Sequence, residues 1–196
     1  TAHSSKVLVD LSGRDPNGDP LGEPTETFVS SSTIQFSSTG GQSHLDLIAD
    51  GVYAADLDGT PLDPAAFSHN RFPFTTEPGT HEITVTALCR YSHSGEGLHR
   101  FVDPADGKVY LYTQFEIADA RRMYADFEQP DQKMTFELQV IAPTGWTIVS
   151  NSPAPEPTEG PWEGMSRWSF EPTLPISTYL TALVAGEYHV DHGTIH

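Results

Sequence analysis

Residues 134–140 read Met-Thr-Phe-Glu-Leu-Gln-Val, and this stretch decides the fold class because apolar and polar side chains alternate along it. A period of two sends successive side chains to opposite faces of a strand, one packed against a core and one facing water. Apolar residues also occupy every second position of residues 83–89, 7–11 and 34–36. Each of these segments is therefore predicted to be a strand.

Glycine and proline interrupt the chain at spacings that suit strands. The chain contains 16 Gly and 16 Pro, and most stretches free of both are short, such as residues 42–50, 65–72, 146–152 and 165–171. Such stretches are too short for an ordinary helix but fit strands of about 5–6 residues. The sequence therefore predicts an all-β fold in which antiparallel sheets pack face to face as a sandwich.

One segment departs from the strand pattern. Asp119 is a residue type that favours helix N-caps, Arg121 and Arg122 are good helix formers, and Pro130 is a stop signal. We expect one short helical turn near residues 119–125.

The composition limits the partners and the location of the protein. The chain has 196 residues with 10 Lys+Arg against 27 Asp+Glu, a formal net charge of −17. This length predicts one domain over residues 1–196, with Asp15–Pro24 and Asn151–Gly164 as surface loops. The negative charge argues against nucleic acid and against an anionic membrane surface, because both bind clustered Lys and Arg. With a single cysteine, Cys89, and no signal peptide in Thr1–Asp10, we expect no internal disulfide and a cytoplasmic location.

The C-terminal histidines form the densest group of metal-ligand types. His189, Asp191, His192 and His196 could in principle approach one ion. A zinc-protease helix, however, needs two His four residues apart with a Glu after the first, whereas His189 and His192 are three apart and Gly193 follows. We interpret these histidines as strand and turn residues, and we expect neither a metal site nor a catalytic residue in this chain.

Two acceptor side chains end the strand predicted over residues 109–116. Period two places Gln114 and Glu116 on one face of this strand, about 7 Å apart. An amide oxygen and a carboxylate so placed can converge on a cation, and an ammonium group suits them because it has only donors. The alternative is structural, with Glu116 capping the next helical turn or pairing with Arg121 or Arg122.

Several motifs in this region resemble the N-terminal domain of the M1 family of zinc aminopeptidases, the aminopeptidase N family. Thr113-Gln-Phe-Glu116 followed by Asp119-Ala-Arg-Arg122 resembles its T-Q-x-E…D-A-R signature. Phe127-Glu-Gln-Pro130, with Lys133 and Phe136, resembles its F-D-[EQ]-P-x-x-K-x-x-F continuation. Further blocks match in order at residues 95–104, 142–146 and 175–182, and the first is similar to bacterial, especially actinobacterial-type, members.

Two residues depart from the pattern of that family. Ala125-Asp126 stands where the family usually has Pro-Cys or Ala-Cys, and Glu128 stands where Asp is usual. Either change could loosen the turn on which it lies, although neither touches Gln114 or Glu116.

The resemblance implies an all-β, saddle-like domain in which Gln114 and Glu116 hold the free α-amine of a peptide substrate. In the family, zinc and the catalytic residues come from the following domain, which carries G-x-M-E-N and H-E-x-x-H motifs absent from this chain. We therefore expect a piece of a zinc metallo-aminopeptidase that ends before its catalytic domain. Its partners would be that domain and the N-terminus of the peptide, and the piece alone would be inactive.

Two other functions remain open at the level of sequence. A non-catalytic interaction or scaffold module is the main alternative, because some relatives of this fold serve as scaffolds. The presence of both Gln114 and Glu116 favours substrate anchoring over this reading. A carbohydrate-binding β-sandwich would rest only on Trp162 and Trp168, interpreted as exposed.

Overall fold

The alternating segment at residues 134–140 lies in strand β8 (Thr135–Pro143), whose side chains alternate between buried and half-buried over most of its length. The computed structural model describes residues 1–191 and 193 of the chain. The strands and the 3-10 turns (η) in this part are, in order, β1 (Ala2–Asp10), β2 (Thr27–Asp46), β3 (Gly51–Leu57), β4 (Thr60–Leu62), η1 (Pro64–Ala66), β5 (Arg71–Arg90), β6 (Gly97–Val102), β7 (Val109–Gln114), η2 (Ala120–Arg122), β8, β9 (Thr147–Ser150), β10 (Thr158–Glu159), β11 (Met165–Ser169), η3 (Thr178–Leu180) and β12 (Leu183–Gly186).

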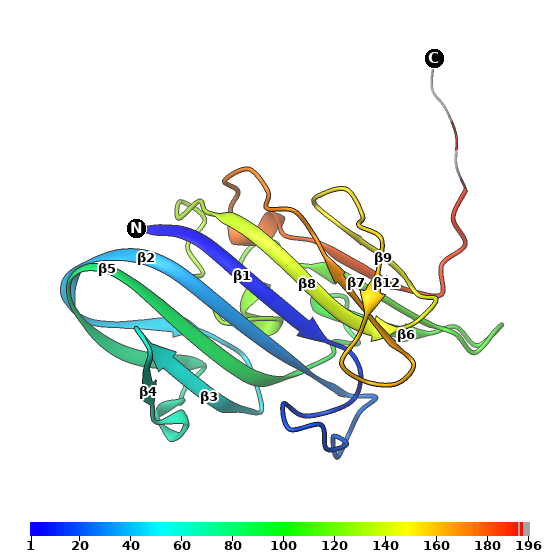
Figure 1. The fold of residues 1–196 in the computed structure, drawn as a ribbon, viewed down its shortest axis with the longest axis horizontal. Coiled ribbons are helices and arrows are strands. Elements are labelled where there is room, and N and C mark those ends of the chain that lie inside the picture. Colours follow the sequence, from blue (N-terminus) through cyan, green and yellow to red (C-terminus); the bar gives the residue numbers. More distant parts are fainter. Residues whose placement is uncertain (192, 194–196) are drawn as a thin grey trace.

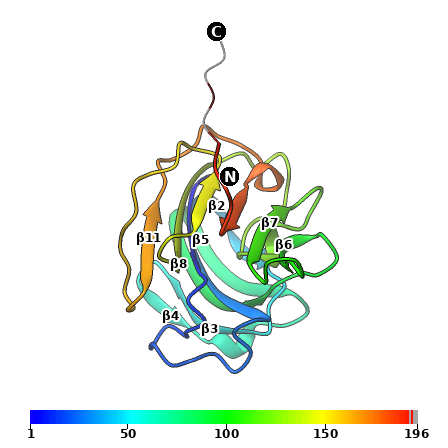
Figure 2. The same ribbon diagram turned by 90° about the vertical axis from the view of Figure 1, so that its right-hand side faces the viewer.

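These strands form two sheets, which confirms the all-β prediction. The larger sheet has eight strands in the order β10-β11-β8-β1-β2-β5-β3-β4, and the smaller has four in the order β6-β7-β12-β9. Figure 2 shows the large sheet curving, with β6 and β7 to its side. One pairing corrects the antiparallel prediction, because β1 and β8 run parallel. A parallel pair needs a long crossover, and here the connection includes the small-sheet strands β6 and β7.

Strands β2 and β5 also correct the expectation of short strands, since each is 20 residues long (Figure 1). They continue through Gly40 and Pro78. Strand β3 pairs with β5 only over Ile83–Leu88, so the edge of β5 that faces away from β2 is unpaired at Pro78. Proline has no backbone N–H, and at an unpaired edge this does not remove a hydrogen bond between strands. Gly40 is needed there because its φ is +89° and a Cβ would lie 2.9 Å from Pro78 Cδ.

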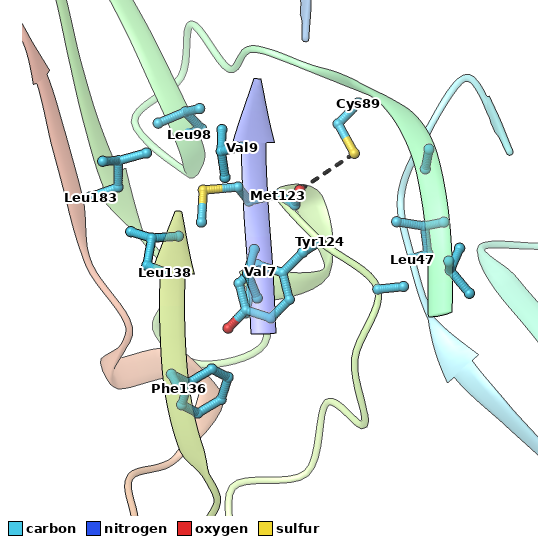
Figure 3. Packing of buried hydrophobic residues seen from close by; sticks show 14 of the residues in the cluster. Val7, Val9, Leu47, Cys89, Leu98, Met123, Tyr124, Phe136, Leu138 and Leu183 are labelled. Carbon is cyan, nitrogen blue, oxygen red and sulfur yellow. Dashed lines mark hydrogen bonds between the residues drawn. The ribbon is translucent and has the colours of Figure 1, made fainter. Parts of the chain in front are cut away.

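The core between the two sheets contains a stretch of non-strand chain, residues 115–126, which we call the core segment. Met123 and Tyr124 are each only 1% exposed, and both lie among residues of the two sheets (Figure 3). The buried members of the core segment are Phe115, Ala120, Met123, Tyr124, Ala125 and Asp126. Packing of the two layers therefore depends on this segment as well as on the strands.

Chain that is buried outside a sheet needs partners for its backbone polar groups. The Arg121 carbonyl accepts from the Ile48 N–H at 2.7 Å, and the Ala125 carbonyl accepts from the Ser32 hydroxyl at 2.7 Å. Asp126 and Asp46 exchange two backbone hydrogen bonds of 2.8 and 3.1 Å. The core segment is thus tied to β2 and to the chain that follows it.

The predicted helical turn is present but shorter than residues 119–125. It is the 3-10 turn η2 (Ala120–Arg122), with Asp119 at the N-cap position. The Asp119 side chain makes no capping hydrogen bond and instead accepts from Arg122 Nε at 2.6 Å. After Arg122 the chain enters the core, where side-chain packing decides its path.

Shortening Met123 tests the importance of the core segment. We expect Met123→Ala to lower the free energy of unfolding of the 196-residue chain by about 2–5 kcal/mol, because it leaves a cavity between the sheets. Leu174→Ala is the control, since Leu174 is 83% exposed and should change stability by less than about 0.5 kcal/mol. Urea unfolding measures both, and equal effects of the two substitutions would contradict this account.

Candidate functional site

Strand β7 carries the two predicted site residues at its end. The strand stops at Gln114, two residues earlier than predicted, but the alternation continues beyond it. Leu111 and Phe115 are buried, whereas Tyr112, Gln114 and Glu116 are exposed. The prediction that Gln114 and Glu116 lie on one face therefore agrees with their shared exposure, although only Gln114 belongs to the strand.

The structure brings Gln114 and Glu116 together through a local hydrogen bond. Gln114 Oε1 accepts from the backbone N–H of Glu116 at 3.0 Å. The Glu116–Ile117 peptide bond is cis, and the Asp119 N–H donates to the Phe115 carbonyl at 3.1 Å. We call residues 114–119 the Glu116 turn. It presents the Glu116 carboxylate to solvent and leaves Gln114 Oε1 one free lone pair.

The structural alternative for Glu116 required a cap or an arginine partner. Arg122 pairs with Asp119 at 2.6 Å and approaches Glu96 at 3.6 Å. The N-cap position of η2 belongs to Asp119. Among the residues that the structure describes, Glu116 forms no ion pair, so its carboxylate is available for another cation.

Next to the Glu116 turn, the outer face of the small sheet carries a row of aromatic and aliphatic side chains that were not singled out from the sequence. His99 lies opposite Tyr112, Tyr112 opposite Val184, and Val184 opposite Val149, so these four residues form a row across the sheet. Tyr112 is 41% exposed and Val149 46%. Ile117 of the turn is exposed as well. Period two within β7 and β9 could have indicated this face, but the strand neighbours that complete the row could not be known.

The two departures from the family pattern are Asp126, the last residue of the core segment, and Glu128, two residues beyond it. Glu128 accepts hydrogen bonds from the Arg121 N–H at 2.8 Å and from the Thr178 hydroxyl at 2.9 Å. These two bonds hold the chain around Glu128 in place. Asp126 is 0% exposed, and neither of its carboxyl oxygens has a hydrogen-bond partner among the described residues. Burial, reinforced by Glu128 and Asp46, raises the pKa of Asp126 well above its usual range, and Arg121 opposes this only partly.

The remaining sequence candidates lie elsewhere. His189 Nε2 is 3.1 Å from Asp191 Oδ1 on an exposed part of the chain, and His192 and His196 fall outside the described residues. No three His, Cys, Asp or Glu side chains gather around a possible metal position in residues 1–191 and 193. Trp168 is only 4% exposed. Trp162 is half-buried, and Arg14 Cζ lies over its ring, 5.6 Å from the ring centre. The interpretation of both tryptophans as exposed was therefore wrong.

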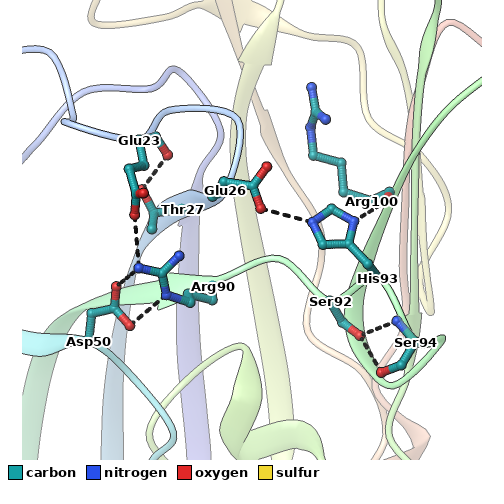
Figure 4. A network of polar contacts seen from close by, with 9 residues as sticks. All are labelled: Glu23, Glu26, Thr27, Asp50, Arg90, Ser92, His93, Ser94 and Arg100. Atoms are coloured by element: carbon teal, nitrogen blue, oxygen red, sulfur yellow. Dashed lines mark hydrogen bonds and ion pairs between the residues drawn. The ribbon is translucent and has the colours of Figure 1, made fainter.

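A polar network joins the loop before β2 to the end of β5 (Figure 4). Arg90 pairs with Glu23 at 2.9 Å and with Asp50 at 2.7 Å. His93 contacts Glu26 at 3.0 Å. Arg90 and His93 already have carboxylate partners, and the Arg100 guanidinium lies over the Tyr91 ring, so we assign the network a structural role.

The fold and this site define a class of protein: an all-β domain that exposes a carboxylate and an amide side chain next to chain buried in its core. Residues 64–180 match the Peptidase M1 N-terminal domain family, and the chain belongs to this family. The resemblance identified from the motifs is therefore confirmed. Within the described part of the chain, no helix is both long and apolar enough to cross a membrane.

Three relatives are named aminopeptidase N. The chain is 46% identical to that of Streptomyces lividans over 196 residues, which cover 98% of this chain and 21% of that protein. It is 38% identical to that of Acetobacter pasteurianus over 65% of this chain and 37% of that protein. It is 34% identical to that of Bos taurus over 56% of this chain and 12% of that protein. The chain thus spans about a fifth of the length of the Streptomyces relative.

Replacing Asp126 tests the pKa assigned to it. The unfolded-state pKa of an Asp is about 3.9, and the pKa of Asp126 is higher in the folded state. The contribution of Asp126 to the free energy of unfolding is therefore greatest below about pH 3.9 and is lost as the pH rises through its folded-state pKa. Asp126→Asn removes the ionisable group and therefore this pH-dependent loss of stability. We expect its melting temperature to exceed that of the parent chain at pH 7, with the difference shrinking as the pH approaches 4.

The exposed Asp131→Asn is the matched control, and it should show no such pH-dependent difference. Thermal melting followed by circular dichroism between pH 4 and 8 measures both variants. An Asp126→Asn effect that does not vary with pH would mean that Asp126 is ionised in the folded protein.

Proposed function

We propose that this chain is the substrate-anchoring N-terminal domain of a zinc metallo-aminopeptidase that removes single N-terminal residues from peptides. Gln114 and Glu116 bind the free α-amine of the peptide in this proposal. The observation that carries it is the exposed Glu116 carboxylate, which has no ion pair among the described residues and whose backbone N–H is held by Gln114 Oε1. The names of the relatives support the reaction class.

The two side chains contribute unequally in this proposal. An α-ammonium has three donors, and its hydrogen bond to an ionised carboxylate is stronger than one to a neutral amide. Gln114 Oε1 already accepts the Glu116 N–H, so it adds one further acceptor and orients the turn. Glu116 therefore supplies most of the binding energy. An internal peptide segment has no ammonium to offer, which would restrict cleavage to the N-terminus.

The partner of this domain, in the same proposal, is the catalytic domain of the same protein. The row formed by His99, Tyr112, Val184 and Val149 offers it a partly apolar surface beside the Glu116 turn. The zinc ion and its ligands would belong to that domain, because the described residues here provide no cluster for a metal. In this proposal the chain alone would be inactive. We also propose that the full-length enzyme acts in the cytoplasm.

We further propose that residues 1–196 form one domain. Support comes from one buried hydrophobic cluster among the described residues, to which both sheets and the core segment contribute. A domain of this kind presents the Glu116 turn on a rigid support, as a substrate-positioning group requires.

The kinetics of Glu116→Gln in the full-length peptidase test the proposal. A charge-assisted hydrogen bond contributes about 1.5–3 kcal/mol, so kcat/KM should fall by roughly 10- to 150-fold. Part of the loss should appear in kcat if the contact also positions the scissile bond. Gln114→Ala should cost less, because it removes a neutral acceptor.

Glu159→Gln serves as the matched control, since Glu159 is an exposed carboxylate on β10, a strand of the other sheet. It should leave kcat/KM unchanged. Zinc content is measured for each variant. Unchanged kcat/KM in Glu116→Gln with full zinc content would contradict the anchoring role and favour the scaffold alternative.

A further inference from the structure

Arg122 holds the C-terminal end of the Glu116 turn. Its Nε donates to Asp119 Oδ1 at 2.6 Å, which is a short charge-assisted contact. The backbone N–H of Asp119 in turn donates to the Phe115 carbonyl at 3.1 Å, closing the turn around Glu116. The side chain that fixes Asp119 therefore fixes the closing hydrogen bond of the turn.

The same arginine also packs against the N-terminal end of the turn. Gln114 pairs with Gly97 across the β6–β7 ladder. A Cβ on Gly97 would lie 2.9 Å from Arg122 Cβ and 3.0 Å from Arg122 Cδ, so the arginine stem fills the space that glycine leaves. Arg122 Nη2 also lies 3.6 Å from Glu96 Oε2, on the residue before Gly97. One side chain thus connects both ends of the Glu116 turn.

The neighbouring arginine has a different environment. Arg121 donates its N–H to Glu128, and its carbonyl accepts from Ile48, so its contacts fix the core segment. The charge of Arg122 is already balanced by Asp119 and Glu96. Arg122 therefore leaves the Glu116 carboxylate unpaired while restraining the backbone that carries it.

We propose that Arg122 is a positioning residue, which sets the place of the Glu116 carboxylate through Asp119 and Gly97. The inference rests on the proposed function, because a position matters only if Glu116 binds the substrate. Glu116 has no ion pair of its own among the described residues, so its placement depends on the backbone of the turn. Displacing a substrate-positioning group by about 1 Å can cost as much as about 100-fold in rate.

The test is a double-mutant cycle in the full-length peptidase. Arg122→Gln should lower kcat/KM roughly tenfold, and by less than Glu116→Gln does. The double variant should be no worse than Glu116→Gln alone, because Arg122 acts only through Glu116. Losses that multiply in the double variant would overturn the inference.

Arg90→Gln provides the matched control. Arg90 also pairs with two carboxylates and is 49% exposed, against 37% for Arg122, but its partners Glu23 and Asp50 lie outside the Glu116 turn. Its substitution should leave kcat/KM unchanged and should lower the melting temperature about as much as Arg122→Gln does. If Arg122→Gln fails to fold, Arg122→Lys replaces it, and the expected kcat/KM lies between the parent and Glu116→Gln values.

A second readout needs no activity. The amide hydrogen of Glu116 should exchange faster with solvent in the 196-residue Arg122→Gln chain than in the Arg90→Gln chain, because the turn loosens. If Glu116→Gln lowers kcat/KM but Arg122→Gln changes neither kcat/KM nor this exchange rate, the positioning role is wrong and the proposed function stands. If Glu116→Gln itself has no effect on kcat/KM, the proposed function fails, and the positioning role fails with it.

Discussion

Burial of the core segment, residues 115–126, between two sheets is the constraint on which the rest of the structure depends. Removing this chain from water gains hydrophobic free energy from Phe115, Met123 and Tyr124, each at most 1% exposed. It also requires partners for the buried backbone groups, and β2 and Ile48, in the chain that follows β2, supply several of them. Phe115 is anchored in the core, and the chain reaches the surface at the next residue, Glu116.

Rigidity and exposure are therefore combined within a few residues. Gln114 ends a strand of the small sheet, and Asp119 precedes a turn that leads into the core. Between them only the Glu116 carboxylate and Ile117 face solvent to a large extent. A group held in this way loses little conformational freedom when it binds a ligand, which favours recognition of a small charged group such as an ammonium.

The sequence predicts the local features of this arrangement and misses the non-local ones. Period two assigned Gln114 and Glu116 to one face, and Asp119 marked the start of η2, because both features depend on near neighbours. The parallel pairing of β1 with β8 joins segments far apart in the chain, so no local pattern encodes it. Likewise, the local Asp119 could be recognised as a partner for Arg122, but the further contacts of Arg122 with Glu96 and Gly97 depend on the β6–β7 register, which no local pattern encodes.

The account centres on Glu116 as the group that binds a peptide α-amine, and a structure of the full-length peptidase with a bound N-terminal amino acid tests this most directly. The account predicts that the ligand nitrogen lies about 2.7–3.2 Å from a Glu116 carboxylate oxygen, with Gln114 Oε1 as a second acceptor. A ligand nitrogen bound by other groups, with Glu116 facing solvent or paired with an arginine, would contradict it.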